Sequence, residues 1–238
     1  MITKNQIKLI RSLRYKKNRS KYQLFVVEGR KNVRELLDSD YNLQSIFANN
    51  IWINDHPEIS VTKVTNNELL RISNQKSPNE VLALVKMKSN HFSSKKGVVL
   101  VLDDVNDPGN MGTIIRACDW FGVSNIVCSN NTVDLYNPKV IQSSMGSIFR
   151  VNIIYTDLLK YLKGVDTQIY GAYMNGENVK SILFPKNLHL VMGNESNGIS
   201  EEVSHLISNK VRINNIGERT DSLNVALASS ILLYEICN

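Results

Sequence analysis

Side chains with potential for chemistry gather in three stretches of the chain. The first, DPGNMGTIIR, contains Asn110 and ends at Arg116. The second, MGNESNGIS, contains Glu195, and the third, TDSLN, contains Ser222 and Asn224. Together they offer a guanidinium, a carboxylate, a hydroxyl and two amides, which can bind an anion, orient a polar substrate and stabilise developing negative charge. The first stretch reads GNMG rather than GxGxxG, which disfavours a nucleotide-dependent oxidoreductase.

These groups also have purely structural explanations. Arg116 follows Gly112 by four residues on one helical face and could be an ordinary surface residue. Glu195 could be solvated. Ser222 could cap the last helix with its hydroxyl, which would leave Asn224 as a surplus amide one turn into an apolar helix. A buried amide needs a partner, so a ligand or another loop is expected there.

Capping explains some of the neighbouring polar residues. Thr220 and Asp221 precede Ser222, and Asp221 suits the positive end of a helix. Ser200 is a good N-cap for the helix SEEVSHLIS, and that role accounts for it fully. One cap is enough for each helix, so the density of polar groups in TDSLN indicates more than capping.

The elements that must position these groups alternate along residues 98–238. This alternation predicts a parallel sheet with helices on both faces, in which ligands bind where strands lead into helices. The expected strands are VVLVLDD, NIVCS, FRVNII, TQIYGAY and LHLVMG, and the expected helices are GNMGTIIRACDWFG (closed by Gly122), NPKVIQSSMG, SEEVSHLIS and SLNVALASSILLYEI.

Residues 1–90 are predicted to form a separate small α/β domain. The polar, Ser-rich stretch KMKSNHFSSKKG separates it from residues 98–238. YQLFVVEG reads as a buried strand and RKNVRELLDS as a helix with Val33, Leu36 and Leu37 on one face. SIFANN and VTKVT read as short strands, and NNELLRIS as a helix with Asn66 as its N-cap.

Charge is divided unevenly between the two parts. The net charge is +6, but residues 1–97 carry 18 basic and 8 acidic side chains (+10), and residues 98–238 carry 10 and 14 (−4). The first 21 residues hold eight basic side chains and no acidic one. This favours a nucleic acid partner, with a solvated basic tail as the alternative. The candidate contacts with RNA are Lys16, Lys17, Arg19, Lys21 and Arg30.

Composition argues against several other classes of protein. No apolar run is long enough to cross a membrane, and the basic N-terminal stretch lacks the uninterrupted apolar segment of a secretion signal. We therefore expect a cytoplasmic protein. Neither a disulfide framework nor a metal site is expected, because the cysteines (Cys118, Cys128, Cys237) and histidines (His56, His91, His189, His205) are isolated from one another.

In their order and spacing, the three stretches resemble the motifs of the SpoU/TrmH family of S-adenosylmethionine-dependent RNA 2′-O-ribose methyltransferases, within the SPOUT superfamily. DPGNMGTIIRACDWFGV resembles the first motif, GNESNGIS the second, and VRIN followed by SLNVALASS the third. KYQLFVVEGRKNVRELL resembles the start of the family's substrate-binding domain. The resemblance covers nearly the whole chain.

The resemblance implies a C-terminal SPOUT domain with a deep trefoil knot, in which S-adenosylmethionine binds bent between the second and third motif loops. It also implies a homodimer with the active site near the subunit interface. The N-terminal domain would resemble ribosomal proteins that grip RNA. Because simpler relatives that modify tRNA often lack such a domain, ribosomal RNA is favoured over tRNA as the substrate.

The resemblance also assigns residues to the site. Arg116 would clamp a phosphate and stabilise oxyanion charge, with the role of general base as the alternative. Asn110 and Asn224 would orient the ribose and the loops, and Glu195 would hold Arg116 or a loop amide. The active-site positions are Asn110, Arg116, Glu195, Ser222 and Asn224, and the cofactor contacts are Gly193, Ile213, Ser222 and Leu223.

Two positions depart from the pattern of many relatives. Ser196 stands where Gly is common, and would crowd the cofactor loop if that position needs a positive φ. Asn214 stands where Pro is common, which leaves the chain less constrained. The departures motivate one rival hypothesis, a non-catalytic RNA-binding or ribosome-assembly protein that retains the fold.

Overall fold

The computed structural model describes residues 2–89, 96–217 and 222–238. His91, Thr220, Asp221 and residues 90–95 of the predicted linker lie outside the described residues. The chain forms two compact units: Met1–Ser89 with Asp134–Phe149, and Asn90–Val133 with Arg150–Asn238. Asp134–Phe149 therefore packs with the N-terminal part of the chain, although we expected it to pack within residues 98–238.

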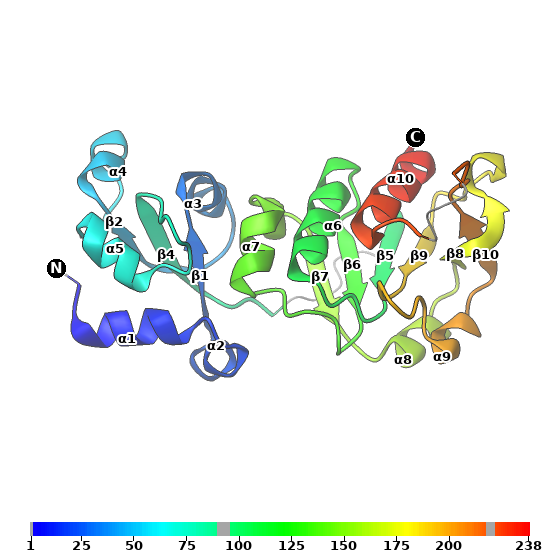
Figure 1. Cartoon of the computed structure of the whole chain (residues 1–238), viewed down its shortest axis with the longest axis horizontal. Helices are drawn as coiled ribbons and strands as arrows, with labels where there is room; N and C mark the ends of the chain where they lie inside the picture. The colour runs from blue at the N-terminus through cyan, green and yellow to red at the C-terminus, as the bar shows by residue number, and fades with distance from the viewer. Residues whose placement is uncertain (1, 90–95, 218–221) are drawn as a thin grey trace. The chain divides into compact units, whose positions relative to one another are not determined.

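The larger unit is built on a six-stranded sheet in the order β10-β8-β9-β5-β6-β7 (Figure 1). All neighbouring strands are parallel, as predicted. The edge strand β10 was not predicted from the sequence. The strands are β5 (Val98–Leu102), β6 (Asn125–Cys128), β7 (Asn152–Tyr155), β8 (Gln168–Asn178), β9 (Leu188–Met192) and β10 (Asn209–Arg212).

Helices cover both faces of this sheet, as the alternating pattern predicted. Val99 and Val101 pack with Leu158, Leu162 and Val203 on the face that carries α8 and α9. Successive strand residues point to opposite faces, so the buried alternate residues of β5 face α6 and α10. The helices are α6 (Pro108–Trp120), α8 (Leu158–Lys163), η2 (Val179–Ser181), α9 (Glu201–Ser204) and α10 (Val225–Cys237).

Helix α6 begins and ends at residues that are typical of helix termini. Asp107 is its N-cap and accepts from the backbone N–H of Asn110, and Pro108 stands in the first turn. Phe121 is the C-cap, and Gly122, which we predicted to close the helix, follows with a φ of 73°. Glycine adopts this left-handed conformation without a steric penalty.

The smaller unit contains a four-stranded sheet in the order β1-β4-β2-β3. The pairs β1–β4 and β4–β2 are antiparallel and β2–β3 is parallel. Its strands are β1 (Leu24–Glu28), β2 (Leu43–Ala48), β3 (Thr62–Lys63) and β4 (Val81–Lys86). Its helices are α1 (Lys4–Ser12), α2 (Lys16–Tyr22), α3 (Arg30–Leu37), α4 (Asn50–Asp55), α5 (Asn66–Ile72), α7 (Pro138–Ser144) and η1 (Ser147–Phe149).

The basic N-terminal segment forms α1 and α2 and is not a solvated tail. Thr3 and Gln6 form a capping box at the start of α1. Ile7, Ile10 and Leu13 are buried in the core of the unit, at the three-residue spacing of one helical face. A second expectation, that Asn66 caps α5, was wrong: Thr65 is the N-cap and Glu68 completes its capping box.

Candidate active site

Side-chain amides join the three predicted stretches in the larger unit. Asn224 Nδ2 donates to Asn110 Oδ1 at 2.9 Å, and Asn110 Nδ2 donates to Glu195 Oε1 at 2.9 Å. Asn110 lies in the first turn of α6, Glu195 follows β9, and Asn224 precedes α10. The structure therefore brings together residues 85 and 114 positions apart in the chain.

Asn224 has a different local role from the one we expected. It is the N-cap of α10, and its Oδ1 accepts from the backbone N–H of Ala226 at 2.9 Å and of Leu227 at 3.4 Å. The structure therefore excludes the alternative in which Ser222 caps this helix. The expected need of the Asn224 amide for a partner is met by Asn110 from another loop. Ser222 and Leu223 are exposed just ahead of the cap.

The loop after β9 is shaped by two glycines and an asparagine. A Cβ on Gly193 would lie 2.2 Å from the backbone carbon of Gly198, so no side chain fits there. Gly198 has a φ of 70°, and Asn194 Oδ1 accepts from the backbone N–H of Ser196 at 2.9 Å. Ser196 is not among the non-glycine residues with positive φ, so the steric conflict considered for it does not arise.

Asp103, which was not among the predicted site residues, anchors the far end of this loop. This carboxylate is 5% exposed, and its Oδ2 accepts from the backbone N–H of Ser200 at 2.8 Å and from its hydroxyl at 2.7 Å. Ser200 does stand at the N-cap position of α9, but its side chain makes no capping bond. The feature of the sequence that could have identified Asp103 is its position, an acidic residue directly after the buried strand β5.

The loops enclose one side of a cavity of about 570 Å³. All four predicted cofactor contacts line it, together with Glu195 and Asn224. Nonpolar side chains from β8, β9, β10 and α10 complete the wall, and none of these was among the predicted cofactor contacts. The lining residues are Ala172, Tyr173, Met174, Met192, Gly193, Asn194, Glu195, Ser196, Asn197, Gly198, Val211, Ile213, Asn214, Asn215, Ser222, Leu223, Asn224, Val225, Ala228 and Leu232.

The cavity has the size and composition of a small-molecule site. Pockets of roughly 300–1,000 Å³ with a mainly nonpolar wall and a few polar groups are typical of such sites. Here the nonpolar part includes Met192, Ile213 and Leu232, and the carboxylate of Glu195 stands among the polar groups. Because Gly193 has no side chain, a ligand can come close to its backbone.

Arg116 lies apart from this wall. It is exposed on α6, six residues and about 9 Å along the helix axis from Asn110. Neither residue lines the cavity. Arg116 makes no hydrogen bond or ion pair with any described residue, and Glu195 accepts from the Asn110 amide rather than from Arg116. Because no residue in the described part of the chain engages the guanidinium, it can meet an anion from outside.

Other kinds of chemistry find no support in the part of the chain that the structure describes. Burial raises the pKa of the Cys118 and Cys128 thiols, which keeps both protonated at neutral pH and excludes them as thiolate nucleophiles. No group of three His, Cys, Asp or Glu residues among those described could hold a metal ion. None of the described helices is long and apolar enough to span a bilayer.

The candidate RNA contacts in the smaller unit fall into two groups. Lys16, Lys17 and Lys21 are exposed on α2. The Arg19 side chain is only 4% exposed, pairs with Asp134, and donates to the backbone carbonyls of residues 13 and 14 at 2.8 Å.

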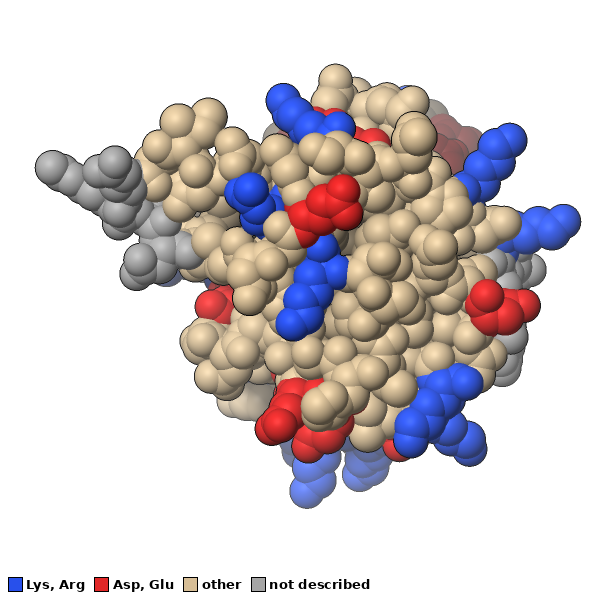
Figure 2. Space-filling model, turned by 90° about the vertical axis from the view of Figure 1, so that its right-hand side faces the viewer, with Lys and Arg blue, Asp and Glu red and all other residues tan. Residues whose placement is uncertain are grey.

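Arg30 is partly neutralised by its surroundings. It binds Asp55 at 2.7 Å and also pairs with Glu80. The structure therefore makes Arg19 a structural residue, whereas Lys16, Lys17 and Lys21 form no ion pair with any described residue. Figure 2 shows that positive and negative side chains are interspersed on the face of the molecule at the β10 end.

Comparisons with known proteins agree with this geometry. Residues 97–234 match the SpoU rRNA Methylase family, and residues 4–83 match the MRM3-like substrate binding domain. The 23S rRNA (guanosine(2553)-2′-O)-methyltransferase RlmP of Bacillus subtilis (strain 168) is 29% identical over 98% of this chain and 96% of its own length.

Solved structures share both units. A protein of the TrmH family of RNA methyltransferases from Porphyromonas gingivalis superposes with a TM-score of 0.90 at 34% identity, covering 99% of this chain and 98% of its own. An AdoMet-bound rRNA methyltransferase from Sinorhizobium meliloti gives a TM-score of 0.88 at 27% identity, covering 99% and 95%. The resemblance read from the three motifs is confirmed, and the chain belongs to the SpoU rRNA methylase family.

Proposed function

We propose that this protein transfers a methyl group from S-adenosylmethionine to a ribose 2′-hydroxyl of ribosomal RNA. The observation that carries the proposal is the convergence of the second and third motif stretches on one cavity, with the Asn224–Asn110–Glu195 chain at its edge. Full-length similarity to a 23S rRNA 2′-O-methyltransferase and to an AdoMet-bound rRNA methyltransferase supports it.

The cavity fits S-adenosylmethionine in size and chemistry. Nonpolar side chains such as Ile213 and Leu232 can enclose the adenine, and backbone groups at Gly193 can reach the ligand because no Cβ intervenes. When bound, the cofactor supplies an electrophilic methyl group on a sulfonium. Asp103 and Asn194 hold the loop that contacts it, through Ser200 and the carbonyl of Asp104.

The chain's own groups would align the ribose and stabilise charge. The amides of Asn110 and Asn224 fix α6 and α10 against Glu195, so a hydroxyl that binds beside them meets a rigid wall. Arg116 would clamp a neighbouring phosphate and stabilise negative charge on the ribose oxygen as its proton leaves. A guanidinium stays protonated in water, which disfavours it as the general base.

A methyl-transfer assay followed by alkaline hydrolysis tests this proposal. A 2′-O-methyl group removes the hydroxyl that attacks the adjacent phosphodiester, so label on a ribose is expected in an alkali-resistant dinucleotide. Label on a base would appear in a mononucleotide and would contradict ribose methylation. RNA binding without any transfer would favour the non-catalytic alternative, although the ordinary backbone at Ser196 removes one of its two supports.

We also propose that the protein acts as a homodimer through α6 and α10. These helices run parallel, because Asn110 and Asn224 meet at their starts and the rings of Phe121 and Tyr234 lie 6.2 Å apart at their ends. Leu227, Ile231 and Tyr234 form one exposed stripe on α10, and Thr113, Arg116 and Trp120 form one on α6. A nonpolar face this exposed favours a protein partner, and Arg116 lies within it.

Leu227→Glu is expected to convert a dimer into a monomer and to abolish methyl transfer. The new charge would be buried without a partner at the interface. Sedimentation should give wild type twice the chain mass of 26.9 kDa and the variant a single chain mass. Leu183→Glu is the matched control, because Leu183 is 99% exposed and lies off both helices. A wild-type monomer, or a dimeric Leu227→Glu variant, would refute the proposed interface.

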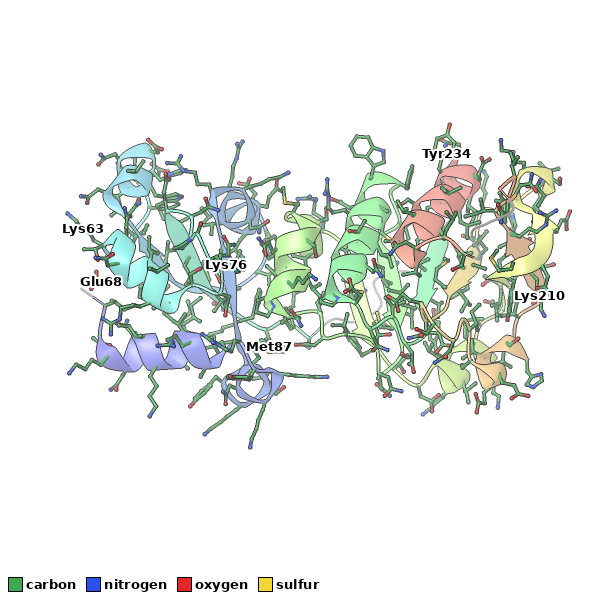
Figure 3. The ribbon with its side chains drawn as sticks, viewed as in Figure 1. Lys63, Glu68, Lys76, Met87, Lys210 and Tyr234 are labelled. Atoms are coloured by element: carbon green, nitrogen blue, oxygen red, sulfur yellow. The ribbon has the colours of Figure 1, made fainter. Side chains whose placement is uncertain are left out.

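The smaller unit is proposed to bind the RNA, with the lysines of α2 contacting phosphates. Tyr15 and Tyr22, at the two ends of α2, are 63% and 45% exposed, and Lys21 Nζ lies 5.3 Å from the centre of the Tyr22 ring. Exposed aromatic rings beside cations can stack on unpaired bases while the cations bind the backbone. Long side chains extend from α2 into solvent (Figure 3).

A double Lys16→Gln, Lys17→Gln variant is expected to weaken RNA binding and flatten its salt dependence. Each lost phosphate contact lowers the slope of log K against log salt by about 0.7 to 0.9. Lys63→Gln, an exposed lysine on β3 (Figure 3), should leave the slope unchanged. These point variants are preferable to deletion of residues 1–21, which would remove Ile7, Ile10 and Leu13 from the core. An unchanged slope in the double variant would exclude these contacts.

We propose three further properties that the family implies: the knot, the cellular location and the class of RNA substrate. The deep trefoil knot is expected in the larger unit, where the loops after β9 and before α10 line the same cavity. A ribosomal RNA substrate would place the protein in the cytoplasm. The substrate-binding domain favours ribosomal RNA over tRNA.

A further inference from the structure

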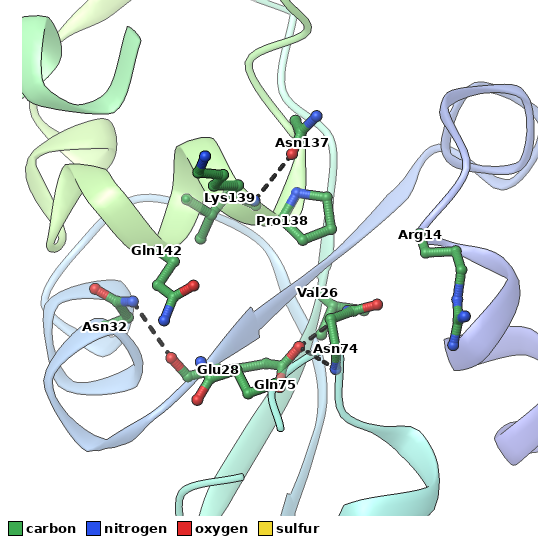
Figure 4. Close-up of a pocket in the computed structure, with 11 residues that line it drawn as sticks. Arg14, Val26, Glu28, Asn32, Asn74, Gln75, Asn137, Pro138, Lys139 and Gln142 are labelled. Atoms are coloured by element: carbon green, nitrogen blue, oxygen red, sulfur yellow. Dashed lines mark hydrogen bonds between the residues drawn. The ribbon is translucent and has the colours of Figure 1, made fainter. Parts of the chain in front are cut away.

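A second cavity, of about 400 Å³, lies in the smaller unit and is unlike the first in chemistry. It lies between β1 and α3, the segment 74–75 that follows α5, and α7 (Figure 4). Polar side chains dominate its wall. The residues are Arg14, Val26, Glu28, Asn32, Asn74, Gln75, Asn137, Pro138, Lys139, Ile141 and Gln142.

Several amides in this wall have hydrogen-bonding capacity to spare. The side-chain amides of Gln75 and Gln142 bind no other described residue, and Figure 4 shows Gln142 reaching from α7 toward β1. Asn32 is 7% exposed, and its Nδ2 donates to the Glu28 carbonyl at 3.3 Å. Asn32 Oδ1 is buried and has no partner among the described residues. A buried acceptor of this kind is costly unless a donor reaches it.

The charged side chains of the cavity differ between its interior, which has a carboxylate, and its rim, which has two cations. The Glu28 carboxylate accepts from the Ser73 hydroxyl and, at 2.9 and 3.0 Å, from the side chain and backbone of Asn74. This fixes the segment that carries Gln75 and leaves a negative charge at the cavity, which disfavours an anion inside. Arg14 and Lys139 are exposed cations at its edge, and Arg14 directly precedes the basic helix α2.

We propose that this cavity binds one unpaired nucleobase of the RNA substrate, with its flanking phosphates at Arg14 and Lys139. A base edge carries N–H donors and acceptors in one plane, which matches the amides of Asn32, Gln75 and Gln142. Proteins that read RNA sequence do so mainly on unpaired bases, which can leave the strand and enter such pockets. The proposal rests on the proposed RNA substrate and adds a site that selects it by sequence.

Binding of single-stranded oligonucleotides by the full chain tests the proposal. The probes are adenylate, cytidylate and uridylate homopolymers of about 12 nucleotides, long enough for one binding groove. Phosphate contacts are the same in all three, so a difference in affinity comes from the bases, either from stacking or from contacts with base edges. Fluorescence anisotropy should show wild type favouring one homopolymer over the weakest by about tenfold, the scale of one specific base contact.

Variants locate that preference in the cavity. Gln142→Leu and Asn32→Leu are each expected to bring the three affinities to within about twofold of one another. Gln44→Leu, an exposed glutamine on β2 outside the cavity, should keep the wild-type preference. Asn32 is buried, so Asn32→Leu could unfold the protein. If it does, the affinities measured for Gln142→Leu decide the test, because Gln142 is exposed.

Equal binding of the three homopolymers by wild type would overturn the proposal, and so would a preference that survives Gln142→Leu. The measurement uses neither cofactor nor turnover. An active methyltransferase without base preference would therefore refute the cavity as a base site while leaving the enzymatic activity standing. A base preference that depends on Gln142, in a protein without methyl transfer, would support the cavity and refute the activity.

Discussion

Arg116→Ala is expected to lower the rate of methyl transfer by at least ~100-fold, the scale of one lost group that stabilises charge in the transition state. Cofactor affinity should stay near that of wild type, because Arg116 does not line the cofactor cavity. The fold should also be unaffected, since the side chain is exposed and binds no described residue. Single-turnover kinetics and calorimetric titration with S-adenosylmethionine measure the two effects separately.

Two further variants complete this experiment. Arg71→Ala removes an exposed arginine of α5 and should keep full activity. Arg116→Lys keeps the charge but loses the planar pair of donors, so a phosphate clamp would be restored only in part. Because an ammonium gives up its proton more readily than a guanidinium, a lysine variant as active as wild type would favour the general-base role. Near-normal turnover in Arg116→Ala would remove Arg116 from the site altogether.

Gly193→Ala is expected to weaken cofactor binding by on the order of 10- to 100-fold, the range for forcing a group into well-packed structure. The new methyl group would lie 2.2 Å from the Gly198 backbone carbon and 2.3 Å from the backbone nitrogen of Ile199. Backbone cannot rotate away as a side chain can, so the loop that lines the cavity must move. Calorimetric titration measures the loss of affinity, and thermal denaturation shows whether the fold survives.

Gly164→Ala provides the matched control for this substitution. A Cβ at Gly164, after α8, would approach no atom more closely than 3.4 Å, which is ordinary van der Waals contact. This variant should bind the cofactor as wild type does. If Gly193→Ala bound it equally well, the backbone at Gly193 would not shape the cofactor site.

Sequence periodicity predicted most of the larger unit because β5 is a continuous apolar run and the other four predicted strands contain short ones. The five assigned strands and the covering of both sheet faces follow from that pattern. In the smaller unit, α1 was missed because its charges mask the short stripe of Ile7, Ile10 and Leu13. The segment Asp134–Phe149 was placed with the wrong neighbours, since local sequence does not show against which core a helix packs.

The sequence predicted which residues form the site but not the hydrogen bonds and ion pairs that they make. Ser222 and Asn224 are both good caps, and the choice depends on the residue at which the backbone becomes helical. Arg19 looked like its basic neighbours, because its partner Asp134 is 115 residues away. Asp103 was missed for the same reason, since Ser200 lies 97 residues away. Such contacts depend on the tertiary fold.

The most direct test of the central claim is transfer of labelled methyl from S-adenosylmethionine to unmodified ribosomal RNA and, in parallel, to total tRNA. The wild-type protein is expected to label ribosomal RNA, to leave tRNA unlabelled, and to lose the signal in Arg116→Ala. Label in tRNA alone would contradict the assigned substrate. No label in either RNA, from a protein that still binds ribosomal RNA, would contradict the enzymatic activity itself.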